Sequence, residues 1–218
     1  MISAAKRFLI LFVCLAFAGC ATLGRNVSGL ADNRAENTFA YPPTLPMNLQ
    51  RVAILPLSVE ETRGDLPDGC DTLNPILLQE LAKLKKFEVV AVNREDLRRR
   101  MGRAGWTGAE VLPADFFASL QRTYGCDAVL FCQLTVFQTY APLAVGWRFK
   151  MVDVRTRQIL WAADEVCDAG QPSVLKAATR YQVCNFKGGE ADGWSIRNSP
   201  RQFGQYAAAR LLATLPAR

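Results

Sequence analysis

Residues 51–59 read RVAILPLSV, and this stretch sets the fold expected for the rest of the chain. It is apolar at both sets of alternating positions as far as Pro56, which is typical of a strand buried on both faces. Such a strand belongs in the middle of a sheet that has helices packed on it. The segment therefore predicts an α/β domain with RVAILPLSV as a central strand.

The elements that follow this strand complete a parallel unit. Residues 60–69 are polar and predict a loop. Asn74 and Pro75 then open a predicted helix as its cap and its first residue, and leucines recur after them at helical spacing. Residues 87–92 form the next predicted strand. A strand, a helix and a second strand in this order imply two parallel strands joined by a crossover.

The middle of the chain predicts two helices and an antiparallel meander. Asn93 caps the first helix, residues 93–105, and Gly125 ends the second, residues 113–124. Three strands joined in sequence order follow these helices. Their predicted ranges are residues 126–140, 145–154 and 159–166.

The last part of the chain predicts two more helices, residues 172–185 and a helix that Ser199 caps. The expected fold is therefore α/β (α+β), with a mixed sheet of about five strands and helices packed on it. The order is strand, helix, strand, helix, helix, strand, strand, strand, and a C-terminal helix pair is appended from about residue 170.

The N-terminal region has the features of a processed leader. Residues 1–7 are basic, and residues 8–18 form an apolar run of eleven, too short to span a bilayer. Ala18 and Gly19 precede Cys20, and this arrangement resembles the bacterial lipobox, although Phe17 stands where Leu is usual. An ordinary secretory signal with a coincidental cysteine is the alternative.

The lipobox resemblance implies that residues 1–19 are a signal peptide and that Cys20 is lipidated, for example with palmitate. Ala21, rather than Asp, follows the cysteine, which implies an anchor in the outer membrane facing the periplasm. Residues 20–48 contain several Asn and Pro residues and predict a flexible tether. Residues 49–218 are then a single domain.

Four segments of the domain resemble a group of envelope proteins. They are RVAILPL, FEVVAVNREDL, CDAVLFCQL and VDVRTRQILW, all within residues 51–166. The order of elements around them is similar to that of the curli-secretion (CsgG-like) lipoproteins, the N-terminal domain of TolB, and LpoB. The hairpin of these proteins often reads Asp-x-x-Thr-Gly. Asp153 and Thr156 match this motif, but Arg157 replaces the Gly. Residues 139–146 are too short for a pair of membrane-spanning strands, which argues against a curli-type channel.

Composition and motifs predict no enzyme, no cofactor and no metal site. The chain of 218 residues has a net charge of +6 and no histidine, so the commonest general base and metal ligand is absent. Five carboxylates near residues 60–71 could bind calcium or serve acid–base catalysis, but a solvated loop is the simpler interpretation. They are Glu60, Glu61, Asp65, Asp68 and Asp71. In the arginine-rich residues 94–103, Glu95 and Arg99 are four residues apart, as are Asp96 and Arg100, so we expect a solvated helix surface, with a basic patch for an anionic partner as the alternative. The mild positive charge predicts no nucleic-acid partner.

Five cysteines follow the predicted lipidation site. An oxidising periplasm permits disulfides, and a Cys167–Cys184 bridge would join the meander to the appended helix. Cys70 and Cys126 are a second possible pair, and we expect Cys132 to lie in the core.

These features predict a non-catalytic envelope lipoprotein that acts as a binding or assembly module. Its expected partners are the membrane, through the lipid, and either envelope proteins or copies of itself. The first alternative is a subunit of a curli-type secretion or transport assembly. The second is a cell-wall enzyme that uses carboxylates.

Overall fold

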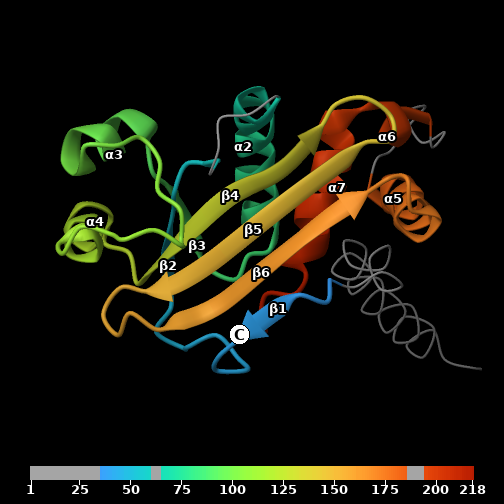
Figure 1. The fold of residues 1–218 in the computed structure, drawn as a ribbon. Coiled ribbons are helices and arrows are strands. Elements are labelled where there is room, and N and C mark those ends of the chain that lie inside the picture. The colour runs from blue at the N-terminus through green and yellow to red at the C-terminus, as the bar shows by residue number, and fades with distance from the viewer. Residues whose placement is uncertain (1–34, 60–64, 186–193) are drawn as a thin grey trace, which may run out of the picture.

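The computed structural model describes residues 35–59, 65–185 and 194–218 (Figure 1). They form one six-stranded mixed sheet in the order β1-β6-β5-β4-β2-β3. Strand β2 is parallel to β3 and β4, and the other pairs are antiparallel. The strands are β1 (Thr38–Ala40), β2 (Arg51–Ile54), β3 (Glu88–Ala91), β4 (Ala128–Gln138), β5 (Ala144–Asp153) and β6 (Ile159–Asp168).

Six helices accompany the sheet in the described residues. They are α2 (Leu66–Lys83), α3 (Arg94–Met101), α4 (Phe116–Tyr124), α5 (Pro172–Asn185), α6 (Trp194–Asn198) and α7 (Pro200–Leu212). Within the described ranges, no helix combines the length and the apolarity needed to cross a bilayer. The mixed sheet, the order of the five predicted strands and the C-terminal helices are confirmed.

The sixth strand, β1, comes from the segment that was predicted to be a flexible tether. Residues 38–40 pair with residues 161–163 of β6, and Ala35, Leu45 and Leu49 are buried. The described part of the predicted tether, from residue 35 on, therefore belongs to the folded domain. A strand of three residues is too short to show alternation, and β1 is held by its pairing with β6 rather than specified by its own pattern.

Helix α2 begins at Leu66, not at Asn74 as the capping pattern predicted. Pro67 lies in its first turn, and Pro75 lies inside the helix. The Asn74 side chain instead accepts a hydrogen bond from the Leu57 N–H at 3.1 Å. This contact satisfies a backbone group that lies just after Pro56, where the central strand stops pairing regularly.

The sheet separates two hydrophobic cores. The larger core lies under α2 and α7 and contains Trp147, Phe149 and Trp161 from the meander. Phe203 and Tyr206 of α7 are fully buried in it, so the C-terminal helices are an integral part of the core rather than an appendage. The smaller core lies on the opposite face, where α3, α4 and the loop at Trp106 cover β2 and β4.

Several local features match the residue types that specify them. The Asn93 side chain accepts hydrogen bonds from the Glu95 and Asp96 N–H groups at the start of α3. Gly125 ends α4 in the left-handed conformation, with φ of 59°. Ser199 accepts from the Gln202 N–H and caps α7, as predicted.

Candidate functional site

The described helices leave part of one sheet face uncovered. Figure 1 looks onto β5 and β6, and no helix of the described residues lies in front of them. A groove of about 360 Å³ runs over this surface, which we call the β5–β6 groove. It is lined by Asn37, Thr38, Phe39, Gly108, Ala109, Phe131, Gln133, Arg148, Phe149, Lys150, Ala162, Ala163 and Asp164.

Strand register builds a polar row across the groove. Arg148 of β5 lies opposite Asp164 of β6 on one side and Gln133 of β4 on the other. The Arg148 Nε atom is 2.6 Å from Asp164 Oδ2, and Nη1 is 3.5 Å from Gln133 Oε1. Alternation along β5 places Trp147 and Phe149 in the core, so the residues between and beyond them face the groove.

The loop between α3 and α4 forms one wall of the groove. Lys150 Nζ donates to the Gly108 carbonyl oxygen at 2.6 Å, and a side chain at Gly108 would collide with the Lys150 stem. Glu110 accepts from the Thr107 N–H and from Arg103. Burial opposes ionisation of Glu110, but these hydrogen bonds and the Arg103 charge outweigh it and lower the pKa of this carboxyl.

The floor of the groove is apolar. Phe131 is buried beneath the floor and stacks on Phe116 with ring centroids 5.9 Å apart, and Ala162 and the edge residue Phe39 supply the accessible apolar surface. A second hollow of about 330 Å³ shares Gly108, Phe131 and Lys150 with the groove. An apolar floor with a polar row suits an extended protein segment or another flat partner surface.

The predicted carboxylate cluster is not assembled within the described part of the chain. Glu60 and Glu61 lie outside the described residues, as does Cys20. Asp65 accepts a hydrogen bond from Thr139 Oγ1 at 2.8 Å. Asp68 and Asp71 are exposed on α2. Among the described residues, no group of three or more His, Cys, Asp or Glu side chains could hold a metal ion.

The described cysteines are all free thiols, so the predicted Cys167–Cys184 bridge is not formed in the structure. Cys167 is fully buried, and its Sγ accepts from Arg210 Nη1 at 3.3 Å, whereas Cys184 is exposed on α5. Burial raises the pKa of the Cys167 thiol to about 11, although Arg210 opposes the shift.

The alternative pair is separated by the sheet. Cys70 lies in the larger core and Cys126 in the smaller one, so a bond between them would have to cross the sheet. Cys132 is buried in the larger core, as predicted, and desolvation strongly raises the pKa of its thiol.

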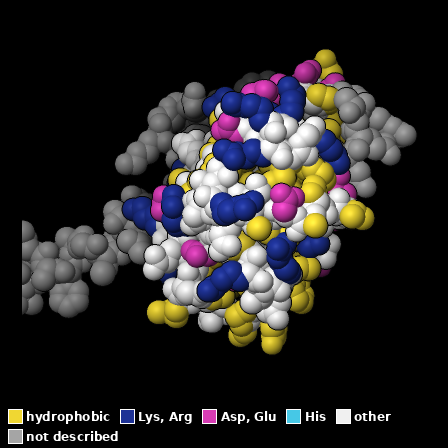
Figure 2. Space-filling view, turned by 90° about the vertical axis from the view of Figure 1, so that its left-hand side faces the viewer, with side chains coloured by type: hydrophobic (Ala, Val, Ile, Leu, Met, Phe, Trp, Pro, Cys, Tyr) yellow, Lys and Arg dark blue, Asp and Glu magenta, His cyan; other side chains and the backbone are white. Residues whose placement is uncertain are grey.

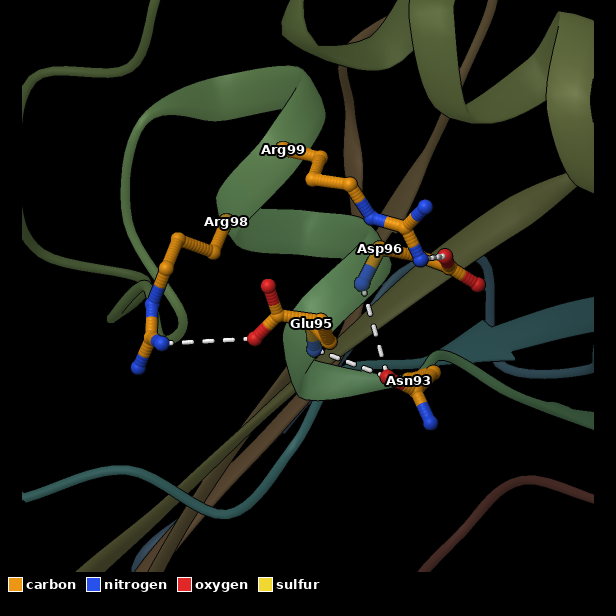
Figure 3. Close-up of polar contacts among 5 residues, drawn as sticks. All are labelled: Asn93, Glu95, Asp96, Arg98 and Arg99. Carbon is orange, nitrogen blue, oxygen red and sulfur yellow. Dashed lines mark hydrogen bonds and ion pairs between the residues drawn. The ribbon is translucent and has the colours of Figure 1, made fainter.

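The arginines of α3 are engaged with neighbouring groups rather than gathered into one basic patch. Arg98 pairs with Glu95 and Arg99 with Asp96, and the two arginines extend to different sides of the helix (Figure 3). The pairs are three residues apart, not four as the sequence suggested. In Figure 2, basic side chains over this side of the molecule are interspersed with acidic, uncharged and hydrophobic ones.

The sequence of β5 shows a polar face but does not show the groove. Alternation already separates Arg148 and Lys150 from the core positions around them. The ion pair with Asp164 needs the register of β6, and the contact of Lys150 with Gly108 needs the position of a distant loop. Phe39 could not be assigned at all, because β1 was not predicted.

No family model matches the chain, and no curated protein matches it in sequence. Two structures of the PelC dodecamer from Paraburkholderia phytofirmans are similar to it, with TM-scores of 0.51 for a variant and 0.49 for the other. Each is 14% identical and covers 83% of this chain and 96% of that chain. The likeness to the PelC subunit shows a shared fold.

Two further structures align over shorter regions. The lipoprotein GNA1162 from Neisseria meningitidis is 20% identical, with a TM-score of 0.34, over 54% of this chain and 79% of that chain. The C-terminal domain of LpoB from Salmonella enterica is 17% identical, with a TM-score of 0.35, over 58% of this chain and 86% of that chain.

Proposed function

We propose that this chain is a lipid-anchored, non-catalytic assembly module of the outer membrane that faces the periplasm and associates with copies of itself. The lipobox-like residues before Cys20 support the anchor and the compartment. The shared fold with a subunit of the PelC dodecamer supports self-association. These two lines of support are independent, because one concerns the leader and the other the folded domain.

The observation that carries the proposal is the β5–β6 groove. Its floor exposes apolar surface on a sheet face that, elsewhere, is covered by α3 and α4. Its charged residues are already paired or hydrogen-bonded within the chain, as Arg148 is with Asp164 and Lys150 with Gly108. A surface of this composition suits a protein contact with an apolar centre and a polar rim.

Light scattering of the purified mature protein in detergent tests self-association. We expect a homo-oligomer, and Ala162→Arg should shift it toward smaller species because the long cationic side chain occupies the groove floor. Val183→Arg is the matched control, since Val183 is an exposed apolar residue of α5, outside the groove. A monodisperse monomer at high concentration, or equal effects of the two substitutions, would contradict the proposal.

Metabolic labelling with radioactive palmitate tests the anchor separately. The unsubstituted chain should take up label and Cys20→Ala should not. Equal labelling of both chains would remove Cys20 as the acceptor without bearing on the groove.

A subunit of a secretion or transport assembly is the second candidate function, supported by the resemblance of residues 51–166 to the curli-secretion lipoproteins. Crosslinking in native membranes distinguishes the two. Crosslinks to copies of this chain alone favour a self-assembling module, whereas reproducible crosslinks through the groove to a membrane transport protein favour the second function.

A further inference from the structure

A second surface feature lies beside the groove, at the start of the folded domain. Residues 39–47 read FAYPPTLPM, and we call them the apolar loop. Phe39, which also lines the groove, is 53% exposed, Tyr41 61% and Met47 81%, and these are three of the seven exposed large hydrophobic side chains in the described residues. Single exposed apolar residues are ordinary, but a cluster within nine residues marks an interaction surface.

The apolar loop is held in place by contacts on its inner side. Leu45 is buried in the larger core, and its N–H donates to the Ala217 carbonyl at 2.8 Å. The Tyr41 N–H donates to the Leu160 carbonyl at 3.1 Å. Leu45 and these backbone hydrogen bonds hold the loop in place, so the positions of its outward side chains are fixed by the folded domain.

Cationic side chains border the apolar loop. Arg218 Nη2 donates to the Met47 carbonyl at 3.4 Å, and Arg218 Nη1 donates to the Lys86 carbonyl at 3.1 Å. Lys86 itself donates to the Pro216 carbonyl at 2.9 Å, which brings a second positive charge to the same corner. Figure 1 shows this loop at the lower edge of the molecule beside the C-terminal end, and Figure 2 shows hydrophobic side chains protruding along that edge.

We propose that the apolar loop contacts the lipid bilayer, with Tyr41 and Met47 entering the boundary between headgroups and acyl chains and Arg218 facing anionic headgroups. Aromatic and apolar side chains next to basic ones are the composition that favours this boundary. The inference rests on the proposed anchor at Cys20. The described chain begins at Ala35, fifteen residues later, and fifteen residues span at most about 50 Å.

The size of the apolar loop favours a bilayer over a second copy of the chain as its main partner. A stable protein interface buries about 800 Å² on each partner. One nine-residue loop with three exposed large side chains offers much less than that, whereas a tethered domain needs only a small additional contact to hold one orientation at a membrane.

Quenching by brominated lipid tests the contact on the full lipidated chain. Tyr41→Trp and the control Tyr140→Trp each place a tryptophan at an exposed tyrosine, the second at the β4–β5 connection. Each is reconstituted into vesicles of brominated phosphatidylcholine with anionic phosphatidylglycerol, and the signal of the unsubstituted chain is subtracted. We expect at least half of the emission from position 41 to be quenched and that from position 140 to be unchanged.

Equal quenching at positions 41 and 140, or none at either, would overturn the proposal. Emission from position 41 that is shifted to shorter wavelength in the detergent-solubilised oligomer, yet unquenched in vesicles, would overturn it in favour of contact between copies. Palmitate labelling of the same preparations separates the two ideas. Labelled protein without quenching removes the loop contact and leaves the anchor, whereas unlabelled protein removes the anchor itself.

Discussion

Replacing Arg210 by Met should destabilise the domain more than any exposed ion-pair substitution. Arg210 lies on α7 and is 5% exposed, while Glu165 of β6 is 21% exposed. The Arg210 Nη2 atom is 2.7 Å from Glu165 Oε1, and its Nη1 donates to Cys167. The side chain therefore ties the C-terminal helix to the sheet through two residues of one strand.

The expected cost follows from what the substitution leaves behind. Removing one partner of a buried ion pair costs about 3–5 kcal/mol, because the other charge stays buried without compensation. Glu165 keeps some access to water, so we expect the lower end, about 3 kcal/mol of unfolding free energy. For a domain of this size that corresponds to a fall in Tm of about 6–12 °C. Adding Glu165→Met should recover at least half of the loss, because the unpaired charge is then gone.

Urea denaturation of the single and double variants measures these effects, and β6 supplies the control. Arg148 pairs with Asp164 on the opposite face of the sheet, with exposed fractions of 41% and 35%. Arg148→Met should therefore cost no more than about 1 kcal/mol. If Arg210→Met costs no more than Arg148→Met, or if the double variant is no more stable than Arg210→Met alone, the Arg210–Glu165 ion pair does not stabilise the domain in this way.

Three further substitutions test local features. Arg157 has a φ of 62°, so Arg157→Gly should be more stable than Arg157→Ala by about 1 kcal/mol in urea, and the reverse order would contradict the strain argument. The pKa of Glu110 is lowered from 4.5, so its contribution to stability is present above that pH and is lost as the pH falls through the lower folded value. The excess stability of the unsubstituted chain over Glu110→Gln, measured in urea, should thus shrink below pH 4.5, and a constant difference would refute it. In Gly204→Ala the new Cβ would lie 2.5 Å from Leu73 Cδ2, so the unfolding free energy should fall by about 1–3 kcal/mol, measured as a lower Tm. In the control Gly105→Ala the new Cβ meets its nearest atom at 3.4 Å, so the stability should hardly change.

Local chemistry in the sequence predicted the features that depend on a few consecutive residues. Asn93 and Ser199 cap helices where expected, and Gly125 ends one, because each satisfies backbone groups within its own turn. The same reasoning predicted that Asn74 caps a helix, and this prediction was wrong. Its side chain bonds to Leu57 across the fold, and no pattern in its neighbours distinguishes that role from a cap.

The Arg157 position shows how a motif can be informative despite a mismatch. The resemblance expected Gly there, and the residue does adopt the left-handed conformation that usually requires Gly. Its guanidinium lies 4.4 Å from the centre of the Phe117 ring, a contact that offsets part of the backbone cost. The turn geometry was therefore predictable from the resemblance, but the compensating contact with α4 was not.

The candidate site was only partly predictable, because it is defined by which elements are absent from a sheet face. Both strands β5 and β6 alternate, and alternation predicts one covered and one uncovered face without saying which surfaces remain open in the finished domain. The C-terminal helices decide this. They were expected to be an appendage, but α7 packs against α2, β5 and β6 and completes the larger core.

Helix α7 packs in the larger core. Among the described helices, only α3 and α4 pack on the opposite face of the sheet, where they cover β2 and β4. Arg148 and Asp164 place a paired charge across the uncovered strands, while Phe39 and Ala162 leave apolar surface accessible beside that pair. A sheet face that contacts only water gains nothing from an apolar floor, and a face that is fully buried in a core would not carry an exposed ion pair. This combination suits a protein contact with an apolar centre and a polar rim, which is why we propose self-association through the β5–β6 groove and membrane contact through the smaller apolar loop.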